Sequence, residues 1–270
     1  MTSYPFADRA AEFERLIAQG GIFDPLTRRL LQDAGLGPGM RVLDIGSGAG
    51  NVARLVADIV GPGGTVVGVD ADLAAVELAS QHNSARNIEF RVADVHTLDG
   101  IEDGFDAVTG RLVLMYLADP VGALRQAASR VRPGGLVCMH EGDLGYLWAS
   151  PQTPLWEQVR AWFLEALQKA GVEARMGPAL CGLYTKAGLP MPRLLFEAAI
   201  AGGPDNLGWG WGNVVSAAVP LMEKLGVATR ADVDPATLSN RLVAETVASG
   251  GCVIGPPMTG AWAVRPVDPY

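Results

Sequence analysis

The chain is poor in the residues that mark metal binding, disulfide frameworks and nucleic-acid binding. Its 270 residues include only 3 cysteines and 3 histidines, with no CxxC pair and no cysteine and histidine at the spacing of zinc ligands. Neither a disulfide framework nor a metal site is therefore expected. Basic residues number 21 against 29 acidic ones, and no cluster of lysine and arginine is present. This charge balance argues against nucleic acid as a partner.

Long apolar runs are also lacking. Charged residues from Asp8 to Arg15 interrupt the start of the chain, so no export signal is expected there. The longest uncharged stretch, residues 246–264, contains glycines and prolines that would break a membrane-spanning helix. We expect a cytoplasmic protein without a membrane anchor, acting on a small molecule, either as a monomer or as a homodimer.

The composition indicates a folded protein with a large core. Hydrophobic residues make up 49% of the chain and charged residues 19%, which is not the composition of a disordered protein. The length exceeds that of an average domain, so we expect either one large domain or one domain with additional elements.

Short apolar runs alternate with helical patterns through the first half of the chain. The runs are almost continuously apolar, which is typical of parallel strands buried on both faces. They cover residues 42–45, 65–69, 88–92, 105–109 and 136–139, and the helical patterns cover residues 51–60, 72–86 and 119–131. Asp72 and Asp119 lie where helix N-caps are expected. This alternation predicts an α/β fold with a mostly parallel sheet, whose ligand site lies at the carboxyl ends of the strands.

Additional elements are expected on both sides of this core. Residues 1–34 are predicted to form a helical cap, with a second helix opening at Asp24-Pro25. The core is assigned to residues 35–202 and 258–270, with strands at 193–200 and 261–265 and a helical addition at 150–188. Residues 203–257 are predicted to form a helical lid that contacts the substrate.

The most specific motif is the sequence VLDIGSGAG at residues 42–50. A strand leads into three glycines at alternate positions, so the backbone can turn tightly and approach a ligand closely. Asp44 precedes the first glycine, and Asn51 stands where a dinucleotide-binding loop would have glycine. A carboxylate at position 44 suits a cationic amino group better than a pyrophosphate.

Two more carboxylates follow the next two strands. Asp70 ends the second strand, where it can accept hydrogen bonds from ribose hydroxyls. Asp94 follows the third strand, where it can accept a hydrogen bond from an adenine amino group. Together with Asp44, these residues outline an adenosine that carries an amino acid.

On these motifs the chain resembles class I S-adenosylmethionine-dependent methyltransferases, especially the bacterial small-molecule and quinone-methylase-like branch. The FDAV sequence at 105–108, Gly110-Arg111 and the RPGG sequence at 132–135 extend the resemblance over about residues 35–145. The AWAVRP sequence at 261–266 resembles the antiparallel final strand of that fold. The resemblance implies a Rossmann-like doubly wound sheet and S-adenosylmethionine as cofactor, released as S-adenosylhomocysteine.

The same resemblance assigns the cofactor-binding residues. Asp44, Gly46, Ser47 and Gly48 would hold the methionine end, while the backbone at Arg111 would accept from its amino group and Tyr4 would close over its carboxylate. Asp70, with Ala71 beside it, would bind the ribose, and Asp94 and Val95 would bind the adenine.

The acceptor side carries no diagnostic motif. His140 and Tyr116 are the candidate catalytic residues, because each follows a strand at the mouth of the sheet. Arg111, Glu141, Trp148, Trp209 and Trp211 are the candidate substrate contacts, and the tryptophans favour an apolar or aromatic acceptor. The acceptor atom, oxygen, nitrogen or carbon, is left open, as is the need for a general base.

Two other functions remain open at this point. The chain could bind the cofactor without transferring a methyl group, for example as a cyclase on the same fold. A nicotinamide-dependent oxidoreductase shares the glycine loop and the ribose carboxylate, but Asp44, Asn51 and the missing Tyr-x-x-x-Lys motif argue against it.

Overall fold

The computed structural model describes residues 9–202 and 210–267, and the chain divides into two compact units. The sheet unit comprises Phe13–Glu141, Met176–Leu195 and the described residues from Thr259 onward. The second unit, here called the aromatic unit, comprises Gly142–Arg175 and the described residues between Phe196 and Met258, together with residues 9–12. Residues 150–175 of the helical addition expected at 150–188 thus cluster with the segment that contains the predicted lid, whereas residues 176–188 belong to the sheet unit.

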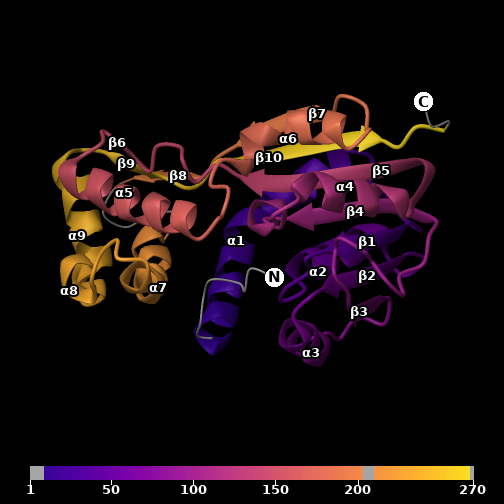
Figure 1. Ribbon diagram of the computed structural model, residues 1–270, viewed down its shortest axis with the longest axis horizontal. Coiled ribbons are helices and arrows are strands. Elements are labelled where there is room, and N and C mark those ends of the chain that lie inside the picture. Colours follow the sequence, from indigo (N-terminus) through magenta and orange to yellow (C-terminus); the bar gives the residue numbers. More distant parts are fainter. Residues whose placement is uncertain (1–8, 203–209, 268–270) are drawn as a thin grey trace. The chain divides into compact units, whose positions relative to one another are not determined.

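The sheet unit is built on a seven-stranded sheet. Its strands lie in the order β3-β2-β1-β4-β5-β10-β7 (Figure 1). They are β1 (Arg41–Ile45), β2 (Thr65–Asp70), β3 (Ile88–Val92), β4 (Phe105–Arg111), β5 (Val131–Gly142), β7 (Arg193–Glu197) and β10 (Met258–Val264). β3, β2, β1, β4 and β5 pair in parallel. The predicted Rossmann-like fold, mostly parallel with an antiparallel final strand, is confirmed.

Hydrogen bonds show that β10 runs antiparallel to its neighbour β5. Gly134, near the start of β5, donates to the carbonyl of Arg265, which follows the end of β10, at 2.9 Å. Arg265 N–H in turn donates to the carbonyl of Gly135 at 2.8 Å. The end of one strand therefore lies beside the start of the other, which is the antiparallel arrangement.

Helices flank this sheet, and the burial of the strands explains the apolar runs. Val42, Leu43 and Ile45 are fully buried, as expected for a strand covered on both faces. The helices and the one short 3₁₀ turn of this unit are α1 (Arg9–Asp33), α2 (Asn51–Val60), α3 (Leu73–Gln81), η1 (Leu114–Tyr116), α4 (Pro120–Ser129) and α6 (Met176–Lys186). The predicted N-caps are confirmed: Asp72 accepts from Ala74 N–H and Asp119 accepts from Gly122 N–H.

The prediction that a second helix opens at Asp24-Pro25 is wrong. α1 runs from Arg9 to Asp33 with Pro25 inside it, although proline in a helix interior removes a hydrogen bond. Phe23, Leu30 and Leu31 are buried on one face of this helix, so packing outweighs the local preference to break.

The aromatic unit combines a small sheet with helices. The strands β6 (Ala149–Ser150), β9 (Cys252–Ile254) and β8 (Ile200–Gly202) pair antiparallel in that order. The helices are α5 (Pro154–Lys169), α7 (Trp211–Lys224), α8 (Arg230–Val233) and α9 (Pro235–Ala248). The single strand predicted at 193–200 is in fact two, β7 and β8, which belong to different sheets.

A stacked tryptophan pair lies at the centre of this unit. The rings of Trp148 and Trp211 are 3.6 Å apart and inclined by 9°, and Phe163 meets Trp148 edge-on at 5.5 Å. Trp211 Nε1 donates to the carbonyl of Ile254, and Trp156 Nε1 donates to the hydroxyl of Thr246 on α9. The indole rings therefore bury their area while their N–H groups keep partners.

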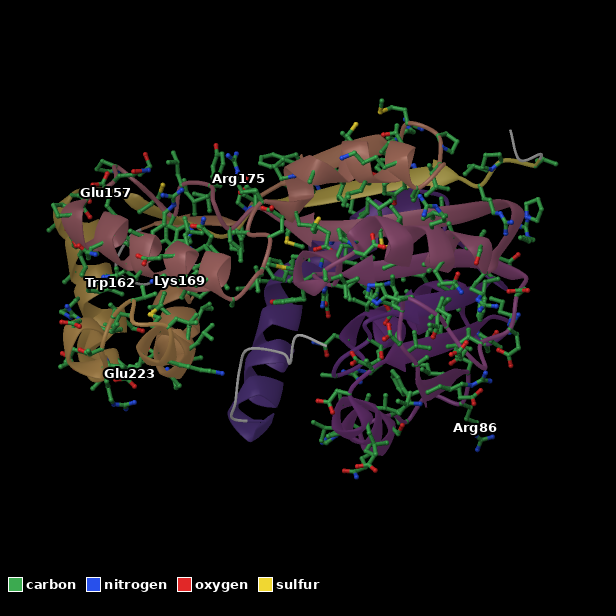
Figure 2. The ribbon with its side chains drawn as sticks, viewed as in Figure 1. Arg86, Glu157, Trp162, Lys169, Arg175 and Glu223 are labelled. Atoms are coloured by element: carbon green, nitrogen blue, oxygen red, sulfur yellow. The ribbon has the colours of Figure 1, made fainter. Side chains whose placement is uncertain are left out.

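Charged side chains cover the outside of the same helices. Figure 2 labels Glu157 and Lys169 on α5 and Glu223 on α7, and all three are exposed. Lys169 pairs with Glu165 one turn earlier at 2.8 Å. The helices of this unit are thus amphipathic, with the tryptophan pair on the inner side.

We expect Trp211→Ala to destabilise the aromatic unit by about 3–5 kcal/mol, because it removes one ring of a buried stack and leaves a cavity. Urea unfolding followed by circular dichroism measures the loss. The matched control is Trp162→Ala on α5, whose ring is only half-buried (Figure 2) and whose removal should cost much less. Equal losses in the two variants would contradict a core role for Trp211.

Candidate functional site

Parallel pairing brings the ends of the central strands to one edge of the sheet. Ile45 lies in register with Val69 on one side and with Gly110 on the other. Arg111 lies in register with His140. The polar residues that end β1, β2, β4 and β5 therefore share this edge, as the sequence predicted.

The glycine loop between β1 and α2 has a backbone that favours glycine. Gly46, Gly48 and Gly50 have φ values of 61°, 48° and 80°. A Cβ at Gly50 would stand 2.6 Å from the ring of Phe90, whereas a Cβ at Gly48 would meet no atom of the described residues within 4 Å. Among the described residues, the backbone at Gly48 thus faces open space, where a ligand can approach it closely.

Asp70 anchors this loop. One of its carboxylate oxygens accepts from Gly48 N–H at 2.9 Å, and the other accepts from Asp72 N–H at 3.0 Å. Burial raises the pKa of Asp70, while these backbone hydrogen bonds lower it. A carboxylate offers about four acceptor positions, so Asp70 keeps capacity for a further hydroxyl donor.

Asp44 is a buried carboxyl group at this edge whose loss of hydration is poorly compensated by hydrogen bonds. It is 1% exposed, and its Oδ2 has no hydrogen-bond partner among the described residues. Burial raises the pKa of Asp44 to about 8, and the positive charge of Arg111 opposes this shift. Ser47 Oγ, on the loop that follows, is also buried and has no partner in the described part of the chain. A ligand with a protonated amino group would satisfy both atoms.

Asp94 lies in a more exposed position. Its Oδ1 accepts from His96 N–H at 2.9 Å and lies 2.8 Å from His96 Nδ1. These contacts lower the pKa of Asp94 and hold the carboxylate ionised. Val95 is half-buried and Ala71 is exposed, so neither is enclosed by the core.

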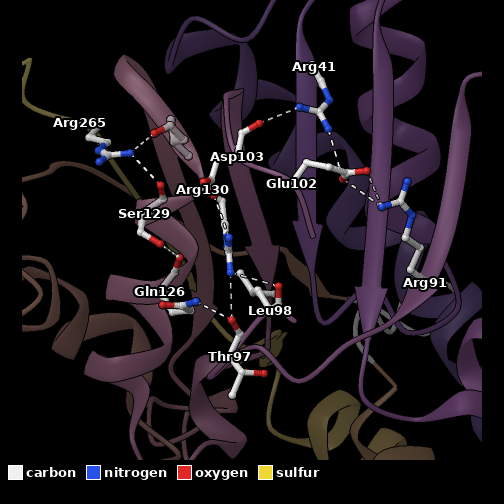
Figure 3. Close-up of polar contacts among 11 residues, drawn as sticks. Arg41, Arg91, Thr97, Leu98, Glu102, Asp103, Gln126, Ser129, Arg130 and Arg265 are labelled. Atoms are coloured by element: carbon white, nitrogen blue, oxygen red, sulfur yellow. Dashed lines mark hydrogen bonds and ion pairs between the residues drawn. The ribbon is translucent and has the colours of Figure 1, made fainter. Parts of the chain in front are cut away.

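Three arginines hold the loop that follows Asp94. Figure 3 shows Arg130 reaching the carbonyls of Thr97 and Leu98, and its guanidinium also pairs with Asp103 at 2.8 Å. Further along the loop, Glu102 pairs with Arg91 and with Arg41 at 2.9 and 3.4 Å. Although each exposed pair contributes little, together they fix a segment that has no regular structure.

Sequence reasoning missed two polar residues of α1 that reach the same edge. Arg111 Nη1 donates to Asp24 Oδ1 at 2.8 Å and to Thr27 Oγ1 at 2.9 Å, and the Arg111 side chain is 8% exposed. Thr27 is 1% exposed and shares the buried face of Phe23 and Leu30. The signal that the sequence offered was Thr27, a polar residue on an otherwise apolar face of the helix.

The contacts of Thr27 also assign the tautomer of His140. The Thr27 hydroxyl donates to the carbonyl of Phe23 at 2.9 Å, and its oxygen lies 3.1 Å from His140 Nδ1. A hydroxyl has one hydrogen, so with that hydrogen on the carbonyl of Phe23, Nδ1 of His140 is the donor and Nε2 carries the lone pair.

Burial and the charge of Arg111 make protonation of His140 unfavourable. His140 is 3% exposed, and its pKa falls to about 3, chiefly through burial. A histidine with so low a pKa is a weak base near neutrality. Catalysis by His140 stays a prediction, and this environment favours a hydrogen-bonding role.

The other residues predicted for the acceptor side occupy different surroundings. Tyr116 ends η1 and is half-buried, whereas Glu141 is fully buried. Trp148 and Trp211 are each 1% exposed in the core of the aromatic unit, so substrate contact by either would require that core to open. Tyr4 and Trp209 lie outside the described residues.

A cavity that the sequence did not reveal lies between α1 and α2. It measures about 460 Å³ and is lined by Gly21, Asp24, Pro25, Arg28, Asn51, Arg54, Leu55 and Asp58. Arg28 and Asp58 pair across it at 3.2 Å. Burial lowers the pKa of Arg54, whose Nη1 has no hydrogen-bond partner among the described residues.

Two absences apply to residues 9–202 and 210–267. No group of three or more histidine, cysteine, aspartate or glutamate side chains in these ranges is placed to hold a metal ion. Within the same ranges, no helix combines the length and the apolar character needed to cross a bilayer.

Comparison with known proteins identifies the family. A family model described as a methyltransferase domain matches residues 36–176, which include the glycine loop and the strand ends through His140. The chain belongs to this methyltransferase family. The ubiquinone/menaquinone biosynthesis C-methyltransferase of Ectopseudomonas mendocina is 30% identical over 160 residues, 57% of this chain and 60% of that protein. The chain spans 38% to 60% of the length of the first curated relatives that it matches.

Solved methyltransferases share the fold. A protein from Aquifex aeolicus described as a SAM-dependent methyltransferase superposes with a TM-score of 0.54 at 15% identity, over 96% of this chain and 98% of that one. A phosphoethanolamine N-methyltransferase of Haemonchus contortus, solved with S-adenosyl-L-methionine, gives 0.53 at 17% identity over 88% and 51%. At these identities the similarity supports the methyltransferase fold alone.

In this methyltransferase domain the burial of Asp44 predicts a pH effect on stability. Between the ordinary pKa of 3.8 and the folded value of about 8, folded Asp44 keeps a proton that the unfolded chain releases. Stability therefore falls as pH rises through this window. Asp44→Asn cannot ionise, so its stability relative to wild type should rise from about pH 5 to 8, by at most about 1.4 kcal/mol per pH unit.

Urea unfolding at several pH values measures this trend. Asp106→Asn is the control, because a hydrogen bond from the backbone of Arg41 lowers the pKa of Asp106 below its ordinary value. Its difference from wild type should stay constant above about pH 5. A constant difference for Asp44→Asn as well would mean that folded Asp44 is ionised throughout.

Proposed function

We propose that the chain transfers a methyl group from S-adenosylmethionine to a small, apolar or aromatic molecule and releases S-adenosylhomocysteine. The observation that carries this proposal is the buried Oδ2 of Asp44, which has no hydrogen-bond partner among the described residues, on the strand that leads into the open backbone of Gly48. A cationic amino acid end bound there would favour the ionised form of Asp44 and lower its pKa, which an uncharged or anionic group would not do.

The other cofactor assignments agree with this placement. Asp70 has acceptor capacity for a ribose hydroxyl, and it also fixes the glycine loop through Gly48. Asp94 is ionised and partly exposed after β3, where it can accept from the adenine amino group, with the Val95 backbone beside it. The carbonyl of Arg111 is assigned to the amino group, while its guanidinium holds α1 through Asp24.

The chain's own residues have a limited chemical task in this reaction. The cofactor supplies a methyl group already activated on a sulfonium. The protein must align the acceptor with that methyl group and exclude water. Neutral His140 can hydrogen-bond an acceptor but is poorly suited to remove a proton. The proposal therefore favours acceptors that are nucleophilic without a strong base.

The small-molecule acceptor is supported by the relatives. One of them is described as acting in quinone biosynthesis, and the chain has no basic cluster for a nucleic acid. The proposal of an apolar or aromatic acceptor is based on the tryptophans of the chain.

Calorimetry with the purified protein tests the cofactor. We expect binding of S-adenosylmethionine and S-adenosylhomocysteine but not of NAD, and NAD binding without adenosylmethionine binding would end the proposal. Asp70→Ala should weaken binding by about 1–3 kcal/mol, roughly 5- to 150-fold, because a ribose hydroxyl loses its acceptor. Asp72→Ala is the matched control: it removes a helix cap two residues away and should leave affinity nearly unchanged.

Mass spectrometry with a panel of quinones, phenols and amines tests the transfer. A methyltransferase adds one methyl group to an acceptor and releases S-adenosylhomocysteine in equal amount. A cyclase on the same fold would convert its substrate without a gain of mass and without consuming the cofactor. Cofactor binding with conversion of that second kind would replace the proposal with the cyclase function.

A further inference from the structure

Glu141 makes contacts that the proposed reaction does not explain. It is fully buried near the end of β5. Its Oε1 accepts from Val113 N–H at 2.9 Å and from Leu114 N–H at 2.8 Å. Backbone N–H groups at the start of a helical turn have no partner inside that turn. Glu141 therefore caps η1 from another strand, 27 residues further along the chain than Leu114.

The backbone that Glu141 holds follows a strained turn. Leu112, the first residue after β4, has a φ of 54°, a left-handed conformation that residues with a Cβ rarely adopt. Its N–H donates to the carbonyl of His140 at 3.0 Å. Successive residues of β5, His140 and Glu141, thus hold successive residues of the turn. Such a conformation persists only where the surroundings impose it.

The segment that Glu141 holds in turn packs closely against the glycine loop. The side chain of Val113 lies so close to Gly46 that a Cβ at Gly46 would stand 1.8 Å from Val113 Cγ2. Gly46 has a φ of 61° and begins the loop that continues through Ser47 and Gly48. A shift of Val113 would therefore displace the backbone of the loop, since close-packed groups cannot move independently.

We infer that Glu141 is a positioning residue for the cofactor-binding loop, acting through the N–H groups of Val113 and Leu114 and the side chain of Val113 on Gly46. The inference rests on the proposed function, because it takes this loop as the site of the adenosyl cofactor. It replaces substrate contact, the role predicted for Glu141 from the sequence, with a role inside the protein.

Calorimetry with S-adenosylhomocysteine as the probe tests the inference. Glu141→Leu removes the acceptor and should weaken binding roughly tenfold or more. Glu141→Gln keeps an oxygen that can accept both N–H groups, so it should bind within about twofold of wild type. Equal affinity of the leucine variant and wild type would overturn the inference. So would a glutamine variant as weak as the leucine one.

A double-mutant cycle with Val113→Ala separates positioning from general destabilisation. Val113→Ala removes the side chain through which Glu141 acts on the loop. Glu141→Leu should therefore weaken binding much less in the Val113→Ala background than in wild type. An undiminished effect would overturn the inference. Should Glu141→Leu not fold, Val113→Ile takes its place: the added methyl group presses on Gly46 and should weaken binding, and unchanged affinity would overturn the inference.

The outcomes distinguish this inference from the proposed function. Wild-type protein that binds neither S-adenosylmethionine nor S-adenosylhomocysteine would remove both. Wild-type binding together with an unaffected Glu141→Leu variant would leave the function standing and remove the inference alone. A leucine variant that keeps its cofactor affinity but has a raised KM for the acceptor would restore substrate contact as the role of Glu141.

Discussion

Parallel pairing of the central strands forces buried polar groups together at one edge of the sheet, and the arrangement of the site follows from this constraint. Asp44 and Glu141 are both almost fully buried there, and burial raises the pKa of Glu141 to about 7. Charged groups in such surroundings are costly unless they are hydrogen-bonded or neutralised. Backbone N–H groups meet part of this cost: Glu141 holds those of η1, and Asp70 holds that of Gly48.

Arg111 supplies positive charge at the same edge, and its guanidinium binds α1 rather than the buried carboxyl group of Asp44. Arg111 does not form a close ion pair with Asp44, because its guanidinium is engaged by Asp24 and Thr27 of α1. Its charge still lowers the pKa of His140 and opposes the rise in the pKa of Asp44. One arginine thus attaches a helix to the sheet, adds to the effect of burial on His140 and opposes it on Asp44, while Oδ2 of Asp44 keeps no hydrogen-bond partner among the described residues.

The sequence predicted the sheet and the glycine loop, because both depend on local patterns. Continuous apolar strands, glycines at alternate positions and the caps Asp72 and Asp119 each act within a few residues. It did not predict α1 through Pro25, since there tertiary packing outweighs a local breaking signal. Nor could it predict the contacts of Asp24 and Thr27, which join residues 84 or more positions apart. For Glu141 it supplied the strand end but not the direction of the side chain.

The aromatic unit carries an optical signature that follows from its core. Two indole rings stacked at 3.6 Å and inclined by only 9° have electronic transitions close enough to couple. Such coupling splits the absorption band of the pair. Trp148 and Trp211 come from distant parts of the chain, so this coupling exists only when 142–175 and the described residues after 210 are packed together. The native protein therefore contains a built-in spectroscopic reporter of tertiary structure in this unit, separate from the helical signal and requiring no added label.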